Sequence, residues 1–331
     1  MNKYLMQVLD RLYFRVAPAR IRVPQKPDSY DFSHITKKEY LENPELFYSK
    51  PDKMPDFSIT RTADIDGVEV VDVKFPSPIQ TKHAKNNTVH GLYFKASGKK
   101  DFATVILLHG WGRSNLWKEK KIALNLARNN INCFILKLPF HFERTPEDTW
   151  SGEYFITGDI HRTVEGTRQL VIEVRTVSSW LRKQVEKVVI SGISLGGMMA
   201  HLAMAAEAFD AGITILAGGN NAGIIWEGIA TGSVKDDLLK AGFNRAQTSH
   251  IYQIINPCIL AKHNKTKRLL MINGLYDEVV PRRFTMELWE ALGRPKIKWY
   301  PCSHVTSILF VKNIAKDMVK FIHGDAEVNH E

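Results

Sequence analysis

Residues 192–197 constrain the fold of this chain more than any other segment. They read Gly-Ile-Ser-Leu-Gly-Gly and lie between the short apolar run 188–190 and a helical pattern of apolar residues. A serine held in a sharp strand-to-helix turn leaves room only for small residues two positions before and after it, where Gly192 and Gly196 stand. The sequence therefore predicts that Ser194 is a nucleophile at a helix N-terminus, where free N–H groups stabilise a developing anion. A glycine-rich turn without chemistry is the alternative interpretation.

Short apolar runs alternate with helical patterns along most of the chain. The runs are residues 103–108, 133–138, 188–190, 213–217 and 269–272, and the helical patterns are residues 122–127, 160–181 and 198–206. Solid runs of this kind are typical of strands that are buried on both faces of a parallel sheet. Residues 68–75 and 88–94 alternate apolar with polar, which predicts antiparallel strands at one edge. The fold class is therefore α/β, with a doubly wound, mostly parallel sheet and right-handed crossovers.

The same patterns divide the chain into four parts. Residues 1–67 are expected to form an N-terminal helix and an irregular lead-in, and residues 68–323 a single catalytic domain. Residues 219–266 interrupt the alternation of strand and helix, which predicts an inserted cap. Residues 324–331 remain as a tail.

The N-terminal helix has one apolar face. Its members are Leu5, Val8, Leu9, Leu12, Tyr13 and Val16, and the other side carries Lys3, Asp10, Arg11 and Arg15. We expect the apolar face to dock against the body of the protein. Contact of residues 1–17 with a membrane surface is the alternative.

Two further residues complete a catalytic constellation. Asp277 follows the apolar run 269–272, and His304 follows the short strand 297–300 just before the last helical pattern. Where a serine nucleophile lies in a turn of this kind, the acid and then the base follow it along the chain, in the order Ser, Asp, His. Glu278 is the rival carboxylate, and capping roles for Asp277 and His304 are the structural alternatives.

Two backbone amides are the candidate oxyanion donors. One is the amide of Leu195, directly after the nucleophile, and the other is the amide of Trp111. Trp111 lies between Gly110 and Gly112 after the run 103–108, and these glycines allow the backbone to approach a substrate closely.

The substrate pocket is expected to include Ile225 and Trp226 from the cap and His141 and Arg144 from a strand end. A metal site built from His141, Glu143, Asp159 and His161 fits no usual ligand spacing, so no metal is expected.

Charge and cysteine usage argue against several other classes of protein. The net charge is +10, but basic residues are scattered among acids without a basic stripe, so no nucleic-acid partner is expected. Cys133, Cys258 and Cys302 stand far apart, which indicates neither a disulfide framework nor a zinc site. No secretory signal and no apolar run of about 18 residues is apparent, so a cytoplasmic location is expected.

At these positions the chain resembles the α/β-hydrolase superfamily. The resemblance rests on His109-Gly110-Trp111 after one strand, Ser194 at the elbow, Asp277 after a late strand and His304 before the last helix. It covers about residues 68–323 and implies an acyl-transfer enzyme for esters, thioesters or amides that needs no metal or organic cofactor, with a pocket roofed by the cap. Residues 138–146 and the long lead-in look like a bacterial esterase-like branch.

The expected function is that of a serine hydrolase that cleaves a carboxylic ester or thioester of a small molecule or a lipid through an acyl-enzyme. A membrane-surface lipase or acyltransferase, and a catalytically silent binding protein of the same fold, are the alternatives. Peptidase activity is less favoured, and the oligomeric state stays open.

Overall fold

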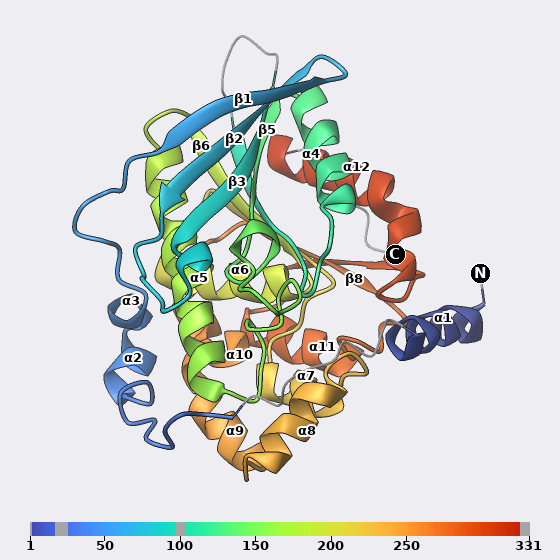
Figure 1. Ribbon diagram of the computed structural model, residues 1–331. Coiled ribbons are helices and arrows are strands. Elements are labelled where there is room, and N and C mark those ends of the chain that lie inside the picture. The colour runs from blue at the N-terminus through green and yellow to red at the C-terminus, as the bar shows by residue number, and fades with distance from the viewer. Residues whose placement is uncertain (1, 17–25, 97–102, 325–331) are drawn as a thin grey trace.

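The computed structural model describes residues 2–16, 26–96 and 103–324 (Figure 1). The strands are β1 (Ser58–Ile65), β2 (Val68–Pro76), β3 (Thr88–Lys95), β4 (Ala103–Leu108), β5 (Ile131–Leu136), β6 (Lys187–Ile193), β7 (Ala211–Ile215), β8 (Leu269–Gly274) and β9 (Lys296–Tyr300). The α-helices are α1 (Lys3–Val16), α2 (Lys38–Glu42), α3 (Pro44–Phe47), α4 (Trp117–Arg128), α5 (Ile160–Leu181), α6 (Leu195–Ala206), α7 (Asn221–Glu227), α8 (Gly232–Lys240), α9 (Arg245–Ile251), α10 (Pro257–Leu260), α11 (Arg282–Ala291) and α12 (Val311–His323). Five 3₁₀ segments join them: η1 (Ala84–Asn87), η2 (Phe142–Arg144), η3 (Tyr252–Ile255), η4 (Ala261–His263) and η5 (Thr306–Phe310).

The strands form one nine-stranded sheet in the order β1-β2-β3-β5-β4-β6-β7-β8-β9. The pairs β1·β2, β2·β3 and β3·β5 are antiparallel, and every pair from β5 to β9 is parallel. Strands β4, β5, β7 and β8 are buried along their whole length, which explains their solid apolar sequences. The predicted α/β fold with a mostly parallel sheet is confirmed.

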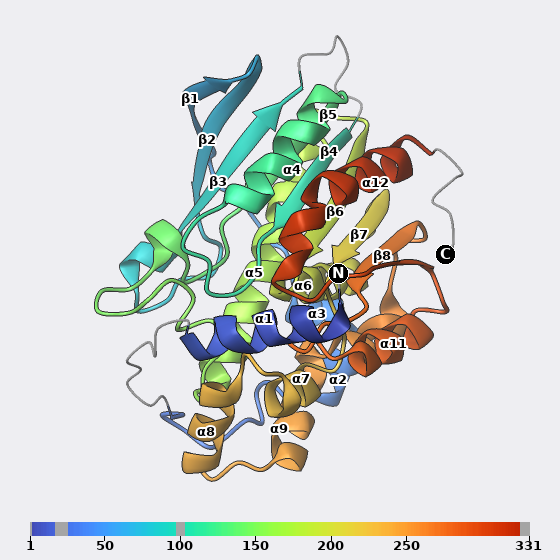
Figure 2. The same cartoon turned by 90° about the vertical axis from the view of Figure 1, so that its right-hand side faces the viewer.

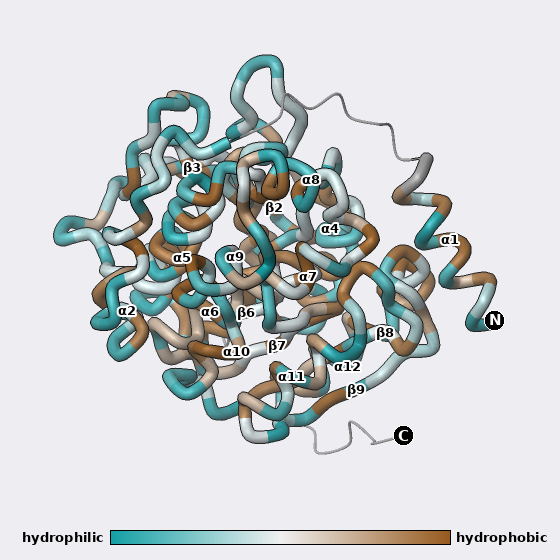
Figure 3. Tube along the Cα trace, turned by 90° about the horizontal axis from the view of Figure 1, so that it is seen from below, coloured by the Kyte–Doolittle hydropathy of each residue, from teal (hydrophilic) through white to brown (hydrophobic). Residues whose placement is uncertain are grey.

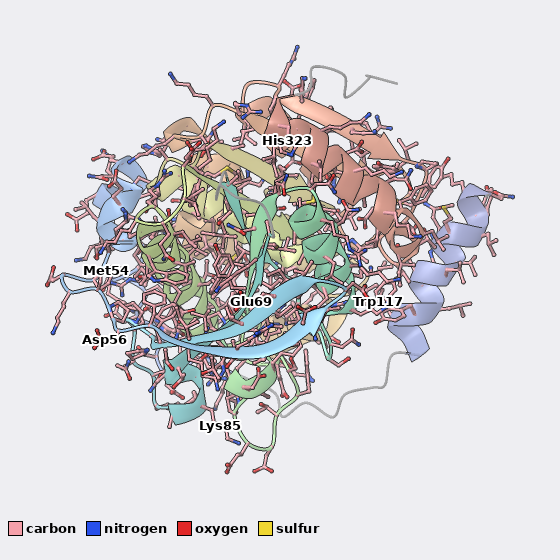
Figure 4. The ribbon with its side chains drawn as sticks, turned by 90° about the horizontal axis from the view of Figure 1, so that it is seen from above. Met54, Asp56, Glu69, Lys85, Trp117 and His323 are labelled. Atoms are coloured by element: carbon pink, nitrogen blue, oxygen red, sulfur yellow. The ribbon has the colours of Figure 1, made fainter. Side chains whose placement is uncertain are left out.

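Helices cover both faces of this sheet. Apolar side chains of α4 and α12 share one hydrophobic cluster with β4, β5 and β8, while α5 and α6 belong to the cluster on the other face. Figure 2 shows α4 and α12 lying together in front of the strands. In the view from above, Glu69 marks β2 in the antiparallel part of the sheet and His323 marks the end of α12 (Figure 4). Because the strands from β5 to β9 run parallel, their carboxyl ends lie at one edge of the sheet between these helices.

The sheet begins earlier than the sequence indicated. Strand β1 starts at Ser58 and pairs with β2, whereas the domain was expected to start at residue 68. Most of the side chains of β1 are exposed, so this edge strand has no apolar pattern that could have marked it. The lead-in is also structured: Tyr48 is buried, and its hydroxyl donates to the carbonyl of Ile254 at 2.7 Å.

Residues 219–266 form a helical layer below the carboxyl edge of the sheet, built from α7 to α10 with η3 and η4 (Figure 1). Buried apolar residues such as Ile224, Val234 and Leu238 join this layer to the main core. The insertion expected from the sequence is therefore helical and shares its buried apolar residues with the main core. Gly324 ends α12, and the rest of the expected tail lies outside the described residues.

Helix α1 contacts the body of the protein through the side of the helix that was expected to face solvent. Met6 and Asp10 are buried, whereas Leu5, Val8 and Leu12 of the apolar face are 50%, 44% and 49% exposed. Figure 3 shows α1 at the periphery of the molecule. The expectation that the apolar face packs on the body is wrong, because Asp10, Met6 and the partly buried Phe14 make the contact instead. Within the described residues, no helix combines the length and the apolar character needed to cross a membrane.

A buried histidine makes the stability of the fold sensitive to acid. His201 of α6 is buried against β7, with Nε2 3.1 Å from Thr214 Oγ1, and burial lowers the pKa of His201 to about 3. The unfolded chain binds a proton on this histidine below about pH 6.5, and the folded chain does not. Its contribution to stability is therefore lost as pH falls from about 6.5.

In the wild type, the free energy of unfolding falls as the pH is lowered below about 6.5. We predict that His201→Leu reduces the slope of this fall by about 1.4 kcal/mol per pH unit. Urea unfolding at several pH values between about 6 and 4 measures this slope. The matched control is His250→Leu at an exposed position, which should leave the slope unchanged. Equal slopes in wild type and His201→Leu would contradict the prediction.

Candidate active site

The site is organised by the turn between β6 and α6. Ser194 has φ 57° and ψ −119°, a conformation that a non-glycine residue adopts only when its surroundings enforce it. Its N–H donates to the carbonyl of Ile215 at the end of β7 over 2.7 Å, and α6 begins at Leu195. These features are those of a nucleophile elbow, in which the serine hydroxyl is presented at the top of the sheet.

Two glycines make this turn possible. A Cβ atom at Gly192 would lie 2.2 Å from the backbone of Gly196, and one at Gly196 would lie 2.4 Å from the carbonyl oxygen of Leu108 in β4. Any side chain at either position would therefore collide with backbone that cannot move. A Cβ atom at Gly110 would lie 3.5 Å from Ser194 Cβ, so the loop after β4 lies directly against the serine.

The structure brings the predicted acid and base together. His304 Nδ1 lies 2.7 Å from Asp277 Oδ2, and both side chains are largely buried. The second carboxylate oxygen of Asp277 accepts the N–H groups of Val279 and Val280, each at 2.9 Å. The carboxylate is thus held in place and directs the Nδ1 proton of the imidazole toward itself, which leaves Nε2 as the basic nitrogen.

The topology places these two residues at the same edge as Ser194. Ser194 follows β6, Asp277 follows β8 and His304 follows β9, and these strands run parallel in the sheet. Glu278, the rival carboxylate, turns away and binds Arg11 instead.

The loop after β4 is fixed by two buried histidines. His109 Nε2 accepts the N–H of Leu138 at 3.0 Å, so its Nδ1–H donates to the carbonyl of Gly110. His141 Nε2 accepts the N–H of Gly112 at 3.2 Å. Burial lowers the pKa of His109 well below its ordinary value, which keeps the ring neutral and able to accept. The residue between these anchors is Trp111, the candidate oxyanion donor.

A cavity with mostly apolar walls opens at Ser194. Ser194, Leu195 and Trp111 all line it, which brings the three predicted residues to one cavity. Its walls come from the loop before α5, from α5 and α6, from the cap and from the loop after β8, and include Phe155, Met198, Met199, Ile224, Ile225 and Val280. The cavity can therefore receive an apolar group next to the serine hydroxyl.

Ile225 is the one residue of the predicted pocket set that lines this cavity. Trp226, its neighbour, packs against the core with Lys235 Nζ 5.7 Å above its ring. His141 lies under the loop after β4, where it binds Gly112 rather than facing the cavity.

Arg144 is a structural residue and does not line the cavity. It is fully buried and forms two hydrogen bonds of 2.7 Å with the carboxylate of Glu173, which is also fully buried. Two carbonyl groups, of Asn86 and Lys137, accept its remaining donors. The sequence predicted a pocket residue here because a charged residue after a strand end resembles a binding residue. The sequence does not show whether such a residue is buried.

The described part of the chain holds no group of three or more His, Cys, Asp or Glu side chains arranged to bind a metal ion. His141, Glu143, Asp159 and His161 do not form such a group.

Sequence reasoning missed Asp10, whose carboxylate accepts the N–H of His304 at 3.1 Å. Nothing in the local sequence could have indicated this contact, because the two residues lie at opposite ends of the chain.

Comparison with known proteins agrees with this architecture. Residues 33–273, more than half of the chain, match the family described as alpha/beta hydrolase domain containing 18. The Rv2627c protein of Mycobacterium tuberculosis H37Rv is 30% identical over 179 residues, which are 53% of this chain and 42% of that protein. The YdjC protein of Bacillus subtilis is 29% identical over 99 residues, or 30% of this chain and 84% of that protein. The chain thus matches less than half the length of the mycobacterial relative.

Solved structures with the same fold include two esterases. The acetyl xylan esterase from Paenibacillus sp. R4 has a TM-score of 0.65 and 14% identity, covering 87% of this chain and 96% of that chain. Acetyl xylan esterase 1 from Thermoanaerobacterium sp. JW/SL YS485 has a TM-score of 0.61 and 16% identity, covering 95% and 99%. At these identities the likeness shows the fold.

The buried ion pair between Arg144 and Glu173 allows a test of whether Arg144 has a structural or a substrate-binding role. We predict that Arg144→Met lowers the free energy of unfolding by about 3–5 kcal/mol, because it leaves the Glu173 carboxylate buried without its partner. Arg294→Met removes an exposed pair with Glu290 and should change stability little. Urea unfolding measures both, and a small effect of Arg144→Met would contradict the structural role.

Proposed function

Because the chain belongs to the family described as alpha/beta hydrolase domain containing 18, we propose that it is a serine hydrolase that cleaves a carboxylic ester or thioester through an acyl-enzyme. The observation that carries the proposal is the 2.7 Å contact between His304 Nδ1 and Asp277 at the sheet edge where Ser194 occupies a strained elbow. A base oriented by a buried carboxylate near a serine that lines a cavity is the arrangement that acyl transfer needs.

In this mechanism Ser194 Oγ attacks the acyl carbonyl carbon while His304 Nε2 takes the hydroxyl proton. The backbone N–H groups of Leu195 and Trp111 donate to the oxyanion that forms, and one such donor contributes about 3 kcal/mol to the transition state. The imidazolium then gives its proton to the leaving alcohol or thiol. Water attacks the acyl-enzyme with His304 as base, which releases the acid and restores Ser194.

The cavity favours substrates with an apolar acyl group. Its walls near Ser194 include Met198, Met199 and Ile225, and thioether side chains adapt to differently shaped apolar groups. Burial of each methylene contributes about 0.8 kcal/mol. We therefore expect kcat/KM to rise with the length of the acyl chain until the chain fills the cavity.

We predict that a fluorophosphonate probe labels the protein and that Ser194→Ala abolishes both labelling and hydrolysis of p-nitrophenyl esters. Asp277→Asn should keep the fold and lower kcat by about 10⁴-fold, because the imidazole loses its oriented tautomer. Gel fluorescence and absorbance assays with esters of graded chain length measure these effects. Ser58→Ala, at an exposed position on β1, is the control and should keep full activity. Labelling that persists in Ser194→Ala, or no labelling of the wild type, would contradict the proposal.

A membrane-surface lipase is a second candidate because of the exposed face of α1. Leu5, Val8, Leu9, Leu12 and Tyr13 all point to solvent beside the loop that carries His304. Such a face, in a chain with net charge +10, is suited to an anionic lipid surface.

This candidate predicts that the protein co-sediments with vesicles that contain anionic phospholipid, and that the double change Leu5→Ser and Leu12→Ser weakens binding several-fold. Both side chains are exposed, so the fold should be unaffected. Ile59→Ser, which removes an equally exposed apolar side chain from β1, is the matched control. Equal sedimentation of all three proteins would contradict a role of this face in membrane binding.

A further inference from the structure

The carboxylate of Asp10 is buried against the loop that carries the catalytic base. Its side chain is inaccessible to solvent, although α1 lies at the periphery of the molecule (Figure 3). Oδ1 accepts the hydroxyl of Ser303 at 2.6 Å and the N–H of Val305 at 2.9 Å, and Oδ2 accepts the N–H of His304 at 3.1 Å. One carboxylate thus binds three consecutive residues, with His304 in the middle.

The next residue of α1 binds the loop that carries the acid. Arg11 Nε and one terminal nitrogen donate to the two oxygens of Glu278 at 2.7 and 2.6 Å, which is a bidentate pair. Glu278 directly follows Asp277. Two adjacent residues of one helix therefore hold the neighbours of both Asp277 and His304.

Burial of a carboxylate is unfavourable unless donors replace the lost water. Here every donor comes from residues 303–305, so the favourable geometry of Asp10 requires this one conformation of the His304 backbone. Asp277 orients the imidazole ring itself through Nδ1. The backbone and the ring of His304 are thus fixed by two different carboxylates from two different parts of the chain.

From these contacts we infer that α1 is a clamp for the two loops that carry the acid and the base, and that Asp10 is a positioning residue for His304. The inference rests on the proposed role of the Asp277–His304 pair. Asp10 does not reach the substrate cavity, so it acts on the reaction through the position of the base. Loss of that position affects kcat, because the proton transfer from Ser194 requires a near-attack geometry.

The decisive variant is Asp10→Asn, which keeps the shape of the side chain and replaces one acceptor oxygen by a donor. An amide cannot accept from all three donors of residues 303–305. We expect kcat for p-nitrophenyl acetate to fall by about 10- to 100-fold while KM changes by less than about threefold. Asp210→Asn is the matched control, because Asp210 also accepts a backbone N–H, that of Val188, but at the opposite end of β6. Its kcat should equal that of the wild type.

A second measurement does not depend on hydrolysis. In a Ser194→Ala background, proton NMR observes the His304 Nδ1 proton that is shared with Asp277 as a downfield resonance. Asp10→Asn should broaden this resonance through faster exchange with water, and Asp210→Asn should leave it sharp. If the wild type neither hydrolyses esters nor reacts with a fluorophosphonate while the resonance still responds to Asp10→Asn, the proposed function fails and the clamp stands.

A charge exchange keeps the inference testable if Asp10→Asn does not fold. Arg11 is more than half exposed, so its variants should be tolerated. Arg11→Glu and Glu278→Arg should each lower kcat several-fold, and the double variant should restore it to within about twofold. An unchanged kcat and an unchanged resonance in folded Asp10→Asn, or single charge variants with wild-type kcat, would overturn the inference.

Discussion

The close approach of the β6–α6 turn to β4 is the constraint on which the rest of the site depends. A Cβ atom at Gly196 would lie 2.4 Å from the carbonyl oxygen of Leu108, so the two backbones touch with no side chain between them. This contact lets Ser194 take its strained conformation, which costs on the order of 1–3 kcal/mol and is enforced by the buried strands on either side. It also brings Gly110 against the serine, which sets the distance between Ser194 and the loop after β4.

The central strands could be predicted because burial on both faces requires a continuous apolar run, and the elbow could be predicted because its sharp turn requires glycines around the serine. Strand β4 matches its apolar run residue for residue, since every one of its side chains is buried. Strand β1 has mostly exposed side chains and, among the described strands, pairs with β2 alone, so its sequence has no such apolar pattern. The acid and base could be proposed from chain order, whereas their 2.7 Å contact depends on how β8 and β9 lie in the sheet.

Polar residues near strand ends show the limit of that reasoning. His141 and Arg144 follow the strand β5 and resemble binding residues in the sequence, yet both are fully buried. His141 accepts the N–H of Gly112 in the loop after β4, and Arg144 pairs with Glu173. Sequence alone does not distinguish a polar side chain that faces a cavity from one that satisfies buried backbone groups, because both uses need the same chemical group.

The orientation of α1 has a similar physical explanation. An amphipathic pattern tells that a helix has two unlike faces, but not which face the protein covers. In this chain burial raises the pKa of Asp10 above its ordinary value, while hydrogen bonds from Ser303 and Val305 oppose that shift. Hydrogen bonds to a charged group contribute about 1.5–3 kcal/mol each, so three of them offset much of the desolvation of the carboxylate. The helix therefore docks through Asp10 together with Met6 and Phe14, and the apolar side chains of Leu5, Val8, Leu9, Leu12 and Tyr13 stay exposed next to the residues that we propose carry out the chemistry.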